Sequence, residues 1–446
     1  MIPALCDEGA ARAALRGLRA SDESDPLGAL ARAVWSVLIE PGDSEAGALI
    51  AARGPLEALR AAVGDDSDGL RRARARWMPR LRPDAIDEAL DAARRCGARL
   101  LRPGDDAWPR GLDDLGPHAP VALWCRGRAD ASRRSAVALV GARASTAYGE
   151  GVASDLAAEL AAAGVTIVSG AAYGVDGAAH RAALSAGGNT VAFLAGGVDR
   201  AYPRGHEAML ARIVDAGAVY SEVACGTAPT KWRFLARNRM IAAMADAVVV
   251  VEAGWRSGSL NTAAHAASLG RALGAVPGPI TSAASAGCHR VLREFGGTCV
   301  TSSQDVLEMV EVEPVREGRS AGGTGLPRES GAGVAPGDAA VSGGGAAGGT
   351  GASPATASAT IADNAAGRGP RAADHRAGER TDDTTRVLDA LSSRVARDVD
   401  EVARRSGMAV DEAAVLLGFA ELEGRVERDD GGGWRTPRNA ARGRGR

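Results

Sequence analysis

Lysine is almost absent from this sequence. The chain has 53 basic residues, of which Lys231 is the only lysine and the remaining 52 are arginine. A phosphate loop of the Walker type needs a Gly-Lys pair followed by Ser or Thr, whereas Thr230 precedes this lysine and Trp232 follows it. Kinase and SxxK nucleophile signatures also need lysines that the chain lacks. The sequence therefore excludes a P-loop ATPase.

Cysteine pairs and long apolar runs are lacking too. The six cysteines are scattered without a CxxC pair, which favours reduced, mostly buried thiols over a zinc site or a disulfide framework. No run reaches the roughly 18 apolar residues that a membrane span needs, and the acidic start has no signal-peptide pattern. We therefore expect a cytoplasmic protein without a membrane span, a bound metal or a cofactor.

The overall charge points to no particular partner. There are 53 basic and 55 acidic residues, so the net charge is -2 and any nucleic-acid footprint must be a local patch. The length of 446 residues and the 46% hydrophobic content allow two or three domains with real cores. Wholesale disorder is excluded.

Changes in composition divide the chain into five segments. Helical spacing predicts an all-helical domain at 1–95, and alternating strand-like and helical runs predict an α/β domain with an extended Rossmann-like parallel sheet at 96–315. Gly, Ala, Ser and Pro dominate 316–384, which predicts a disordered linker because few large apolar side chains remain to form a core. Renewed periodicity predicts a winged helix at 385–437, followed by a basic tail at 438–446.

Each predicted strand of the α/β domain ends in small or polar residues. Ligands bind beyond the carboxyl ends of parallel strands, where glycine lets backbone amides approach an anion, so we expect a site there. No second glycine follows Gly141 as in the dinucleotide fingerprint, which argues against nicotinamide or flavin. The alternative is that the glycines only permit tight turns. The predicted strands are 136–140, 165–168, 191–194, 219–220, 248–251 and 275–276.

The segment from Lys231 to Arg239 is the strongest local signal. It carries four cations, no acids and two aromatic rings, in a chain with only 3% aromatic residues. Cations follow a phosphate backbone and aromatic faces stack unpaired bases, so the segment predicts binding of single-stranded nucleic acid. The alternative is structural, with Trp232 or Phe234 packed in the core and Arg237 or Arg239 paired with Glu222 or Glu252.

Two other polar groups have both a functional and a structural interpretation. Asp176 and His180 are four residues apart on a predicted helix, which fits acid-base chemistry or half of a metal site. No further ligand stands at metal spacing, so a capping carboxylate and a packed histidine fit better. The hydroxyls and amides of Ser257–Ser259 would bind a phosphate at a helix start or simply cap that helix.

Several motifs together resemble one family. Gly141-Ala-Arg143, SGAAYGVDGAAHRAAL from Ser169, RNRMIA from Arg237, VVVEAGWRSGSLNTA from Val249 and AVPG from Ala275 occur in the order seen in the DNA-processing protein A (DprA/Smf) family. The resemblance covers about residues 99–310. The helical N-terminal part is similar to that family's sterile-alpha-motif-like domain, and many members carry a C-terminal winged helix. The chain departs from the family at Ala142, where serine is usual.

The resemblance implies a protein that is not an enzyme. It would bind single-stranded DNA entering by natural transformation, protect it and load the RecA recombinase, as a homodimer whose interface lies near 288–300. Phosphates would lie at Gly141–Arg143 and Ser169-Gly170, cations would come from Lys231 and from the segment 237–239, and Phe234 would stack a base. The predicted DNA-binding residues are Gly141, Ala142, Arg143, Ser169, Gly170, Lys231, Phe234, Arg237, Asn238, Arg239, Ser257, Gly258 and Ser259.

An enzyme remains the alternative from another class. A phosphoribohydrolase-like, nucleotide-processing enzyme would use the same crevice, with Asp176, His180 or Glu252 as the acid-base group. The predicted winged helix adds a separate expectation, because its presumed recognition helix at 411–421 carries acids and no arginine. Phosphate repulsion opposes reading of a DNA groove by such a helix. We therefore expect a protein contact or a regulatory role there.

Overall fold

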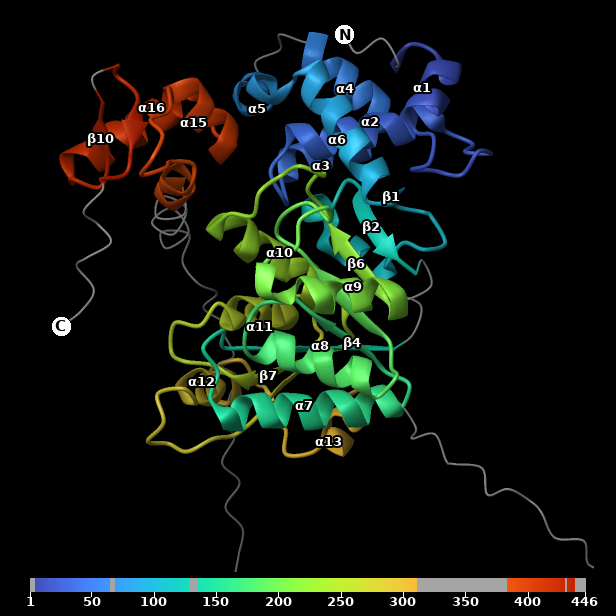
Figure 1. Ribbon diagram of the computed structural model, residues 1–446, viewed down its shortest axis with the longest axis vertical. Helices are drawn as coiled ribbons and strands as arrows, with labels where there is room; N and C mark the ends of the chain where they lie inside the picture. Colours follow the sequence, from blue (N-terminus) through green and yellow to red (C-terminus); the bar gives the residue numbers. More distant parts are fainter. Residues whose placement is uncertain (1–4, 65–68, 129–134, 311–382, 430, 438–446) are drawn as a thin grey trace, which may run out of the picture. The chain divides into compact units, whose positions relative to one another are not determined.

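Most of the chain has a described structure, given by a computed structural model. The linker predicted at 316–384 lies outside the described residues except for its last two positions, and the predicted basic tail at 438–446 lies outside them entirely. The described residues, coloured in Figure 1, are 5–64, 69–128, 135–310, 383–429 and 431–437.

The N-terminal part is helical, as the sequence predicted. Asp25 caps helix α2 by accepting a hydrogen bond from the Gly28 amide, and the proline that follows it suits the first helical position. The rings of Trp35 and Trp77 meet edge to face with centroids 5.1 Å apart, inside a core of alanine and leucine. The helices are α1 (Glu8–Ala14), α2 (Pro26–Leu38), α3 (Ser44–Arg53), α4 (Pro55–Gly64), α5 (Arg71–Trp77) and α6 (Pro83–Arg95), with the 3-10 turn η2 (Met78–Arg80).

A nine-stranded sheet forms the central part of the molecule, in the order β1-β2-β6-β5-β4-β3-β7-β8-β9. Strands from β6 to β9 in that order pair in parallel, and all of them except β9 were predicted. Strands β1 and β2 add an antiparallel edge that the sequence did not reveal. The strands are β1 (Arg99–Leu101), β2 (Leu123–Gly127), β3 (Ala136–Gly141), β4 (Thr166–Ser169), β5 (Thr190–Phe193), β6 (Ala218–Ser221), β7 (Ala247–Glu252), β8 (Ala272–Ala275) and β9 (Thr298–Cys299).

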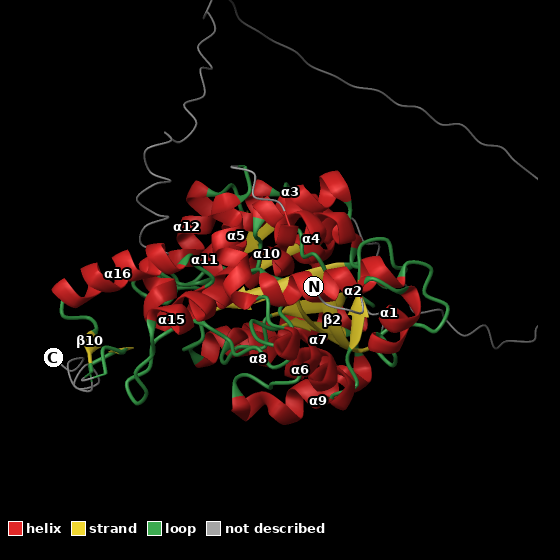
Figure 2. Ribbon diagram, turned by 90° about the horizontal axis from the view of Figure 1, so that it is seen from above, coloured by secondary structure: helices red, strands yellow, loops and turns green. Residues whose placement is uncertain are grey.

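Helices cover both faces of the sheet, because alternate strand residues point to opposite sides. Val137 and Leu139 of β3 pack towards α7, α8 and α13, whereas Ala138 and Val140 pack towards α10, α11 and α12. Figure 2 shows the strands between these helices. The elements are η3 (Arg110–His118), α7 (Ala147–Ala162), α8 (Val175–Ser185), η4 (Arg204–His206), α9 (Glu207–Ala216), α10 (Lys231–Met244), α11 (Ser259–Ser268), α12 (Ala286–Glu294) and α13 (Ser303–Met309).

The C-terminal part has the composition of a winged helix: three helices followed by a small hairpin. A helix at 383–389 precedes α15 (Val399–Ser406) and α16 (Val410–Leu422), and β10 (Glu427–Arg428) pairs antiparallel with β11 (Trp434–Arg435). A separate cluster of buried side chains holds this part together. Of the helices in the described ranges, none combines the length and the apolar character that crossing a membrane requires. The boundaries proposed for the domains stay predictions.

Candidate nucleic-acid interface

A crevice of about 840 Å³ opens beyond the carboxyl ends of β3 and β7. Strands β4, β5 and β6 follow β3 on one side, and β7, β8 and β9 lie on its other side, so the crevice occupies the switch point where open α/β sheets bind ligands. The described residues that line it include four cations and one carboxylate, that of Asp176. The cations are Arg143, Lys231, Arg237 and Arg256.

The loop after β3 is held in place by Glu252 at the end of β7. Its carboxylate accepts hydrogen bonds from the amide and the hydroxyl of Thr146, both at 2.8 Å. Phosphates were predicted at Gly141–Arg143, but the Ala142 amide donates to the Glu252 carbonyl at 2.7 Å. This amide is therefore not free to bind a phosphate. The loop presents the exposed Arg143 side chain to the crevice instead.

Helix α10 begins at the crevice. Thr230 caps it by accepting a hydrogen bond from the Arg233 amide at 3.2 Å, so the positive end of the helix dipole lies beside Lys231. Lys231 is exposed. The ammonium group of Lys231 and the N-terminus of the helix both attract anions, so two sources of positive charge lie together here.

Three side chains meet over the crevice: Arg143 from the loop after β3, Tyr202 from the loop after β5 and Phe234 from α10. We call these three residues the ring group. The Cζ atom of Arg143 lies 4.5 Å from the centroid of the Phe234 ring. The Tyr202 ring lies 5.3 Å from it, tilted by 49°. Phe234 is half-buried and Tyr202 is 46% exposed, so the group is an open aromatic surface with a cation over it.

Arg237 lies at the bottom of the crevice and is buried. Its Nη1 donates to the Phe193 carbonyl at 2.9 Å, and its Nε has no partner among the described residues. Burial lowers the pKa of Arg237 to about 10, against the opposing effect of nearby Asp176. Gly170 makes room for this side chain, because a Cβ there would lie 1.7 Å from Nη1. The Gly170 amide donates to Asp176, so Gly170 accommodates Arg237 rather than holding a phosphate.

The two remaining cations of α10 face away from the crevice. Arg233 forms an ion pair with Glu40 at 2.7 Å. Arg239 is 5% exposed; its Nη2 lies 2.6 Å from Glu222, while Nε and Nη1 donate to backbone carbonyls. The predicted DNA contact of Arg239 was therefore wrong, and the structural alternative holds, because each nitrogen of its buried guanidinium has a partner inside the fold.

The predicted hydroxyl and amide groups also divide into a buried residue and residues that line the crevice. Ser169 is fully buried and donates to the Leu139 carbonyl at 2.7 Å, so it cannot reach a phosphate and that assignment was wrong. Asn238 and the segment Ser257–Ser259 do line the crevice. The hydroxyls of Ser257 and Ser259 lie 2.8 Å apart at the start of α11, and Asn238 donates to the Gly258 carbonyl at 3.3 Å. Their role in binding stays a prediction.

The groups proposed for acid-base chemistry are held inside the protein. His180 is fully buried with Nδ1 2.7 Å from the Thr190 hydroxyl, and burial lowers its pKa to about 3. Asp176 accepts from the Gly170 and Ala172 amides, and burial raises its pKa although Arg237 opposes this. Glu252 braces the loop after β3. The described residues contain no cluster of three or more His, Cys, Asp or Glu arranged for a metal ion.

One aromatic and one basic side chain are among the lining residues that the sequence analysis missed. Tyr202 and Arg256 both line the crevice, and both follow the carboxyl end of a parallel strand, β5 and β7. That position was the available signal, since the sequence analysis already placed the site at those strand ends.

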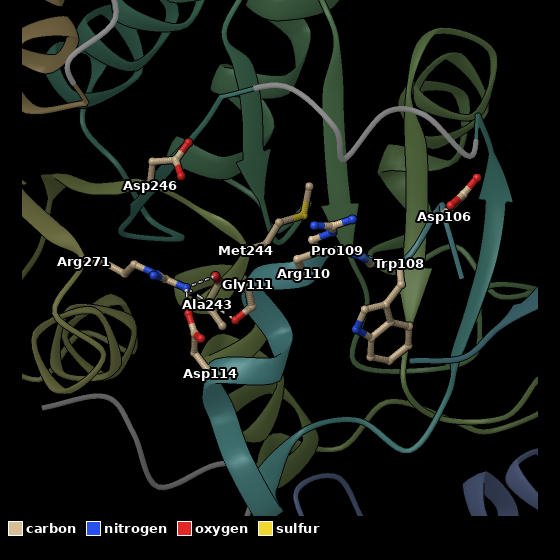
Figure 3. A pocket seen from close by; sticks show the side chains of 10 residues that line it. All are labelled: Asp106, Trp108, Pro109, Arg110, Gly111, Asp114, Ala243, Met244, Asp246 and Arg271. Atoms are coloured by element: carbon tan, nitrogen blue, oxygen red, sulfur yellow. Dashed lines mark hydrogen bonds and ion pairs between the residues drawn. The ribbon is translucent and has the colours of Figure 1, made fainter. Parts of the chain in front are cut away.

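A second cavity of about 690 Å³ lies at the other end of the sheet, before β7 and β8 begin (Figure 3). Arg271 points into it and donates to Asp114 at 2.5 Å and to the Ala243 carbonyl at 2.9 Å. The described lining includes three carboxylates, those of Asp106, Asp114 and Asp246, and two guanidinium groups. Because carboxylates outnumber guanidinium groups in this lining, the cavity does not favour binding of a polyanion.

Family models match the central and the C-terminal parts of the chain. The family model described as DNA recombination-mediator protein A matches residues 99–311, and the one described as DprA winged helix domain matches residues 371–432. A DprA protein of Mycobacterium tuberculosis is 47% identical over 302 residues, which cover 64% of this chain and 76% of that protein. The chain belongs to the DprA/Smf family. Its members are named as DNA-processing proteins, as the motifs of the sequence indicated.

Other DprA proteins match a smaller share of the chain. DNA processing protein DprA of Streptococcus pneumoniae is 42% identical over 211 residues, covering 46% of this chain and 72% of that protein. A crystal structure of the Streptococcus pneumoniae protein aligns with a TM-score of 0.46 and 36% identity, over 53% of this chain and 85% of that one. A Helicobacter pylori DprA structure, described for its single-stranded DNA binding mode, aligns with a TM-score of 0.43 and 30% identity, over 46% of this chain and 93% of that one.

Proposed function

We propose that this DprA chain binds single-stranded DNA in the crevice, protects it, and passes it to the RecA recombinase during natural transformation. The observation that carries the proposal is the exposed Lys231 beside the ring group, in a crevice whose described lining has four cations and one carboxylate. Cations next to open aromatic faces are the combination that unpaired strands require. Membership in a family described as recombination mediators supports the same function.

The half-buried ring of Phe234 favours binding of a single strand over binding of a duplex. Phe234 is half-buried between Arg143 and Tyr202, so only a base that leaves its own stack can reach it. In a duplex each base is paired and stacked, and extruding one costs a few kcal/mol. We therefore expect duplex DNA to bind through charge alone, and more weakly.

Fluorescence anisotropy tests this function directly. Labelled oligo-dT of about 20 nucleotides is titrated with the full chain at several salt concentrations, beside a duplex of equal length. We expect tight oligo-dT binding, and a slope of log affinity against log salt near -2, from about -0.7 for each of three phosphates at Arg143, Lys231 and Arg256. Equal affinity for the duplex, or a slope near zero, would overturn the proposal.

The partners and the absence of catalysis are part of the proposal. The chain acts as a homodimer in the cytoplasm, speeds RecA assembly on oligo-dT that is already coated with a single-strand-binding protein, and leaves the DNA chemically unchanged. Light scattering is expected to give twice the chain mass of 45.2 kDa. A monomer mass, RecA assembly at an unchanged rate, or nucleotides released from the oligo-dT would each contradict the corresponding part.

A further inference from the structure

Two of the six cysteines in the described ranges lie against each other. Cys96 caps the C-terminus of helix α6, whereas Cys225 lies far along the chain, in the loop between β6 and α10. The core cluster that contains Cys225 also packs against Cys96, and the two side chains share a hydrogen bond. The fold therefore brings together two thiols from separate elements.

The two thiols differ in their access to solvent. Cys96 is half-buried, whereas Cys225 is 3% exposed. A small oxidant dissolved in water can thus reach Cys96, while Cys225 meets it only through the sulfur of Cys96. This is the arrangement of a reacting thiol with a second, resolving thiol behind it.

Two charged side chains are held beside the pair. Arg126 of β2 donates to a backbone carbonyl of the loop after β5 at 3.3 Å, and Asp199 of that loop accepts from the amide that follows Cys225 at 2.9 Å. The hydrogen bond from Cys225, helped by Arg126, lowers the pKa of Cys96 to about 7, although burial and Asp199 oppose this. The same hydrogen bond and burial raise the pKa of Cys225. A substantial fraction of Cys96 is therefore the reactive thiolate near neutral pH.

Two other cysteines show what this environment adds. Cys125 and Cys288 are buried, and burial raises the pKa of each to about 11. Their thiols stay protonated at neutral pH and are inert. The pair of Cys96 and Cys225 differs from them because it combines a thiolate that solvent can reach with a second thiol in contact.

We propose that Cys96 and Cys225 form a redox modification site, at which a hydroperoxide converts the two thiols into a disulfide that joins α6 to the loop before α10. Neither residue is among the described residues that line the crevice, so this inference goes beyond the function proposed above and does not rest on it. The pair also lies beside β6, on the other side of the sheet from β9 and from the segment 288–300 that was predicted as the dimer interface.

The reaction takes two steps. The Cys96 thiolate attacks one oxygen of hydrogen peroxide, so that an S–O bond forms, the O–O bond breaks, and the departing hydroxide takes up the proton that the thiol had released. The Cys225 sulfur then attacks the sulfenic acid of Cys96, so that an S–S bond forms, the S–O bond breaks, and the second hydroxide leaves with the Cys225 proton as water. The two thiols are oxidised and the peroxide is reduced to water. A dithiol in solution reverses the change by attacking the Cys96 sulfur, which it can reach.

Peroxide treatment of the folded full chain tests the site without any substitution. Remaining thiols are then blocked with N-ethylmaleimide, and tryptic peptides are mapped without reductant. We expect one linked pair of peptides that carries Cys96 and Cys225, lighter than the two separate peptides by about 2 Da because two hydrogens are lost. Dithiothreitol is expected to release both peptides, and unfolding the chain in urea before the peroxide is added is expected to abolish the preference for this pair.

Three serine variants separate the roles of the two thiols. Cys225→Ser is expected to leave Cys96 as a sulfenic acid that dimedone labels, because the resolving thiol is missing. Cys96→Ser is expected to leave Cys225 reduced, because Cys225 is buried. Cys299→Ser is the matched control at an exposed cysteine of another strand, and is expected to form the disulfide as the unchanged chain does.

Several outcomes would overturn the redox site. If the linked peptides are absent, or if Cys96 proceeds to a sulfinic acid while Cys225 stays a thiol, the two residues do not act as a pair. Peptides linked only through Cys6 or Cys299 would show that peroxide joins surface thiols instead. Equal formation of the link in urea would show that the fold does not bring the two thiols together. None of these measurements uses DNA, so the proposed function is tested separately.

Discussion

Helix α10 carries four cations, and its two sides use them in different ways. On the crevice side, Lys231 is exposed and Arg237 has a guanidinium nitrogen without a partner among the described residues. On the other side, Arg233 shares the buried Glu40 with Arg80, and Arg239 is paired with the buried Glu222. A run of basic residues is therefore not a DNA-binding surface as a whole. Only the side whose cations line the crevice is placed to meet a polyanion there, and the other side holds the fold together.

A substitution on the inward side of α10, at Arg239, is expected to cause the largest loss of stability. Arg239→Ala leaves Glu222 buried without its partner, and breaking a buried ion pair of this kind costs about 3–5 kcal/mol. Urea denaturation measures the loss. Replacing both residues, as Arg239→Met with Glu222→Leu, is expected to recover part of it. Weak oligo-dT binding by the folded double variant would show that Arg239 contacts DNA after all.

Glu40, which pairs with the inward side of α10, makes the stability of the fold depend on pH. Burial opposes its ionisation, but Arg233 and Arg80 outweigh this and lower the pKa of Glu40 from 4.5 to about 2. The stabilisation is thus complete above pH 4.5 and is lost as the pH falls towards 2, about 3 kcal/mol in all. Glu40→Gln is expected to be less stable at neutral pH and to show a flatter acid dependence in urea denaturation. Equal acid slopes would contradict the pairing.

The crevice side is expected to change affinity with little change in stability. Lys231→Ala together with Arg143→Ala removes two charge-assisted contacts, each worth about 1.5 kcal/mol or more, so oligo-dT binding weakens about 100-fold. The salt slope also flattens by about 1.4. Anisotropy at several salt concentrations measures both, and urea denaturation serves as the control. A variant with an unchanged slope would place the phosphates elsewhere.

Phe234 contributes through its ring rather than through charge. Phe234→Ala removes one stacked base, which costs about tenfold in oligo-dT affinity and leaves the salt slope unchanged. Phe234→Trp keeps an aromatic face and is expected to retain most of the affinity. If the alanine variant altered the slope instead, the ring would be acting by positioning Arg143, whose guanidinium lies over it.

The cavity at the other end of the sheet is expected to show the smallest effect. Arg271 is partly exposed and already paired with Asp114, so Arg271→Ala costs about 1 kcal/mol or less in unfolding free energy. Oligo-dT affinity is expected to stay within error in the same anisotropy assay. A marked loss would mean that DNA reaches the surface in Figure 3.

Local sequence was enough for the parallel strands β3 to β8, though not for β9, and for the place of the crevice. Apolar runs ending in glycine or serine predicted the parallel strands, and parallel strands bring their carboxyl ends together without further information. Lys231 and Phe234 were predicted from their type and spacing and do line the crevice; their role in binding stays a prediction. Membership in the DprA/Smf family is confirmed by the matching relatives.

Whether each cation of α10 faces the crevice or the interior depends on partners that local sequence does not reveal. Arg233 is separated from Glu40 by 193 positions, and the amide of Ala142 bonds to a strand that begins at residue 247. Such pairings exist only once the sheet has formed. The same reason explains why the antiparallel strands β1 and β2 escaped prediction, since their short runs carry no periodicity of their own.

Ultraviolet cross-linking of oligo-dT to the full chain, followed by peptide mapping, tests the central claim most directly. A photo-excited thymine reacts only with side chains that it touches, so the map reports which side of α10 meets the bases. The account predicts cross-links at Phe234, on the crevice side of α10. Cross-links confined to the cavity beside Arg271, or to helix α16, would contradict it.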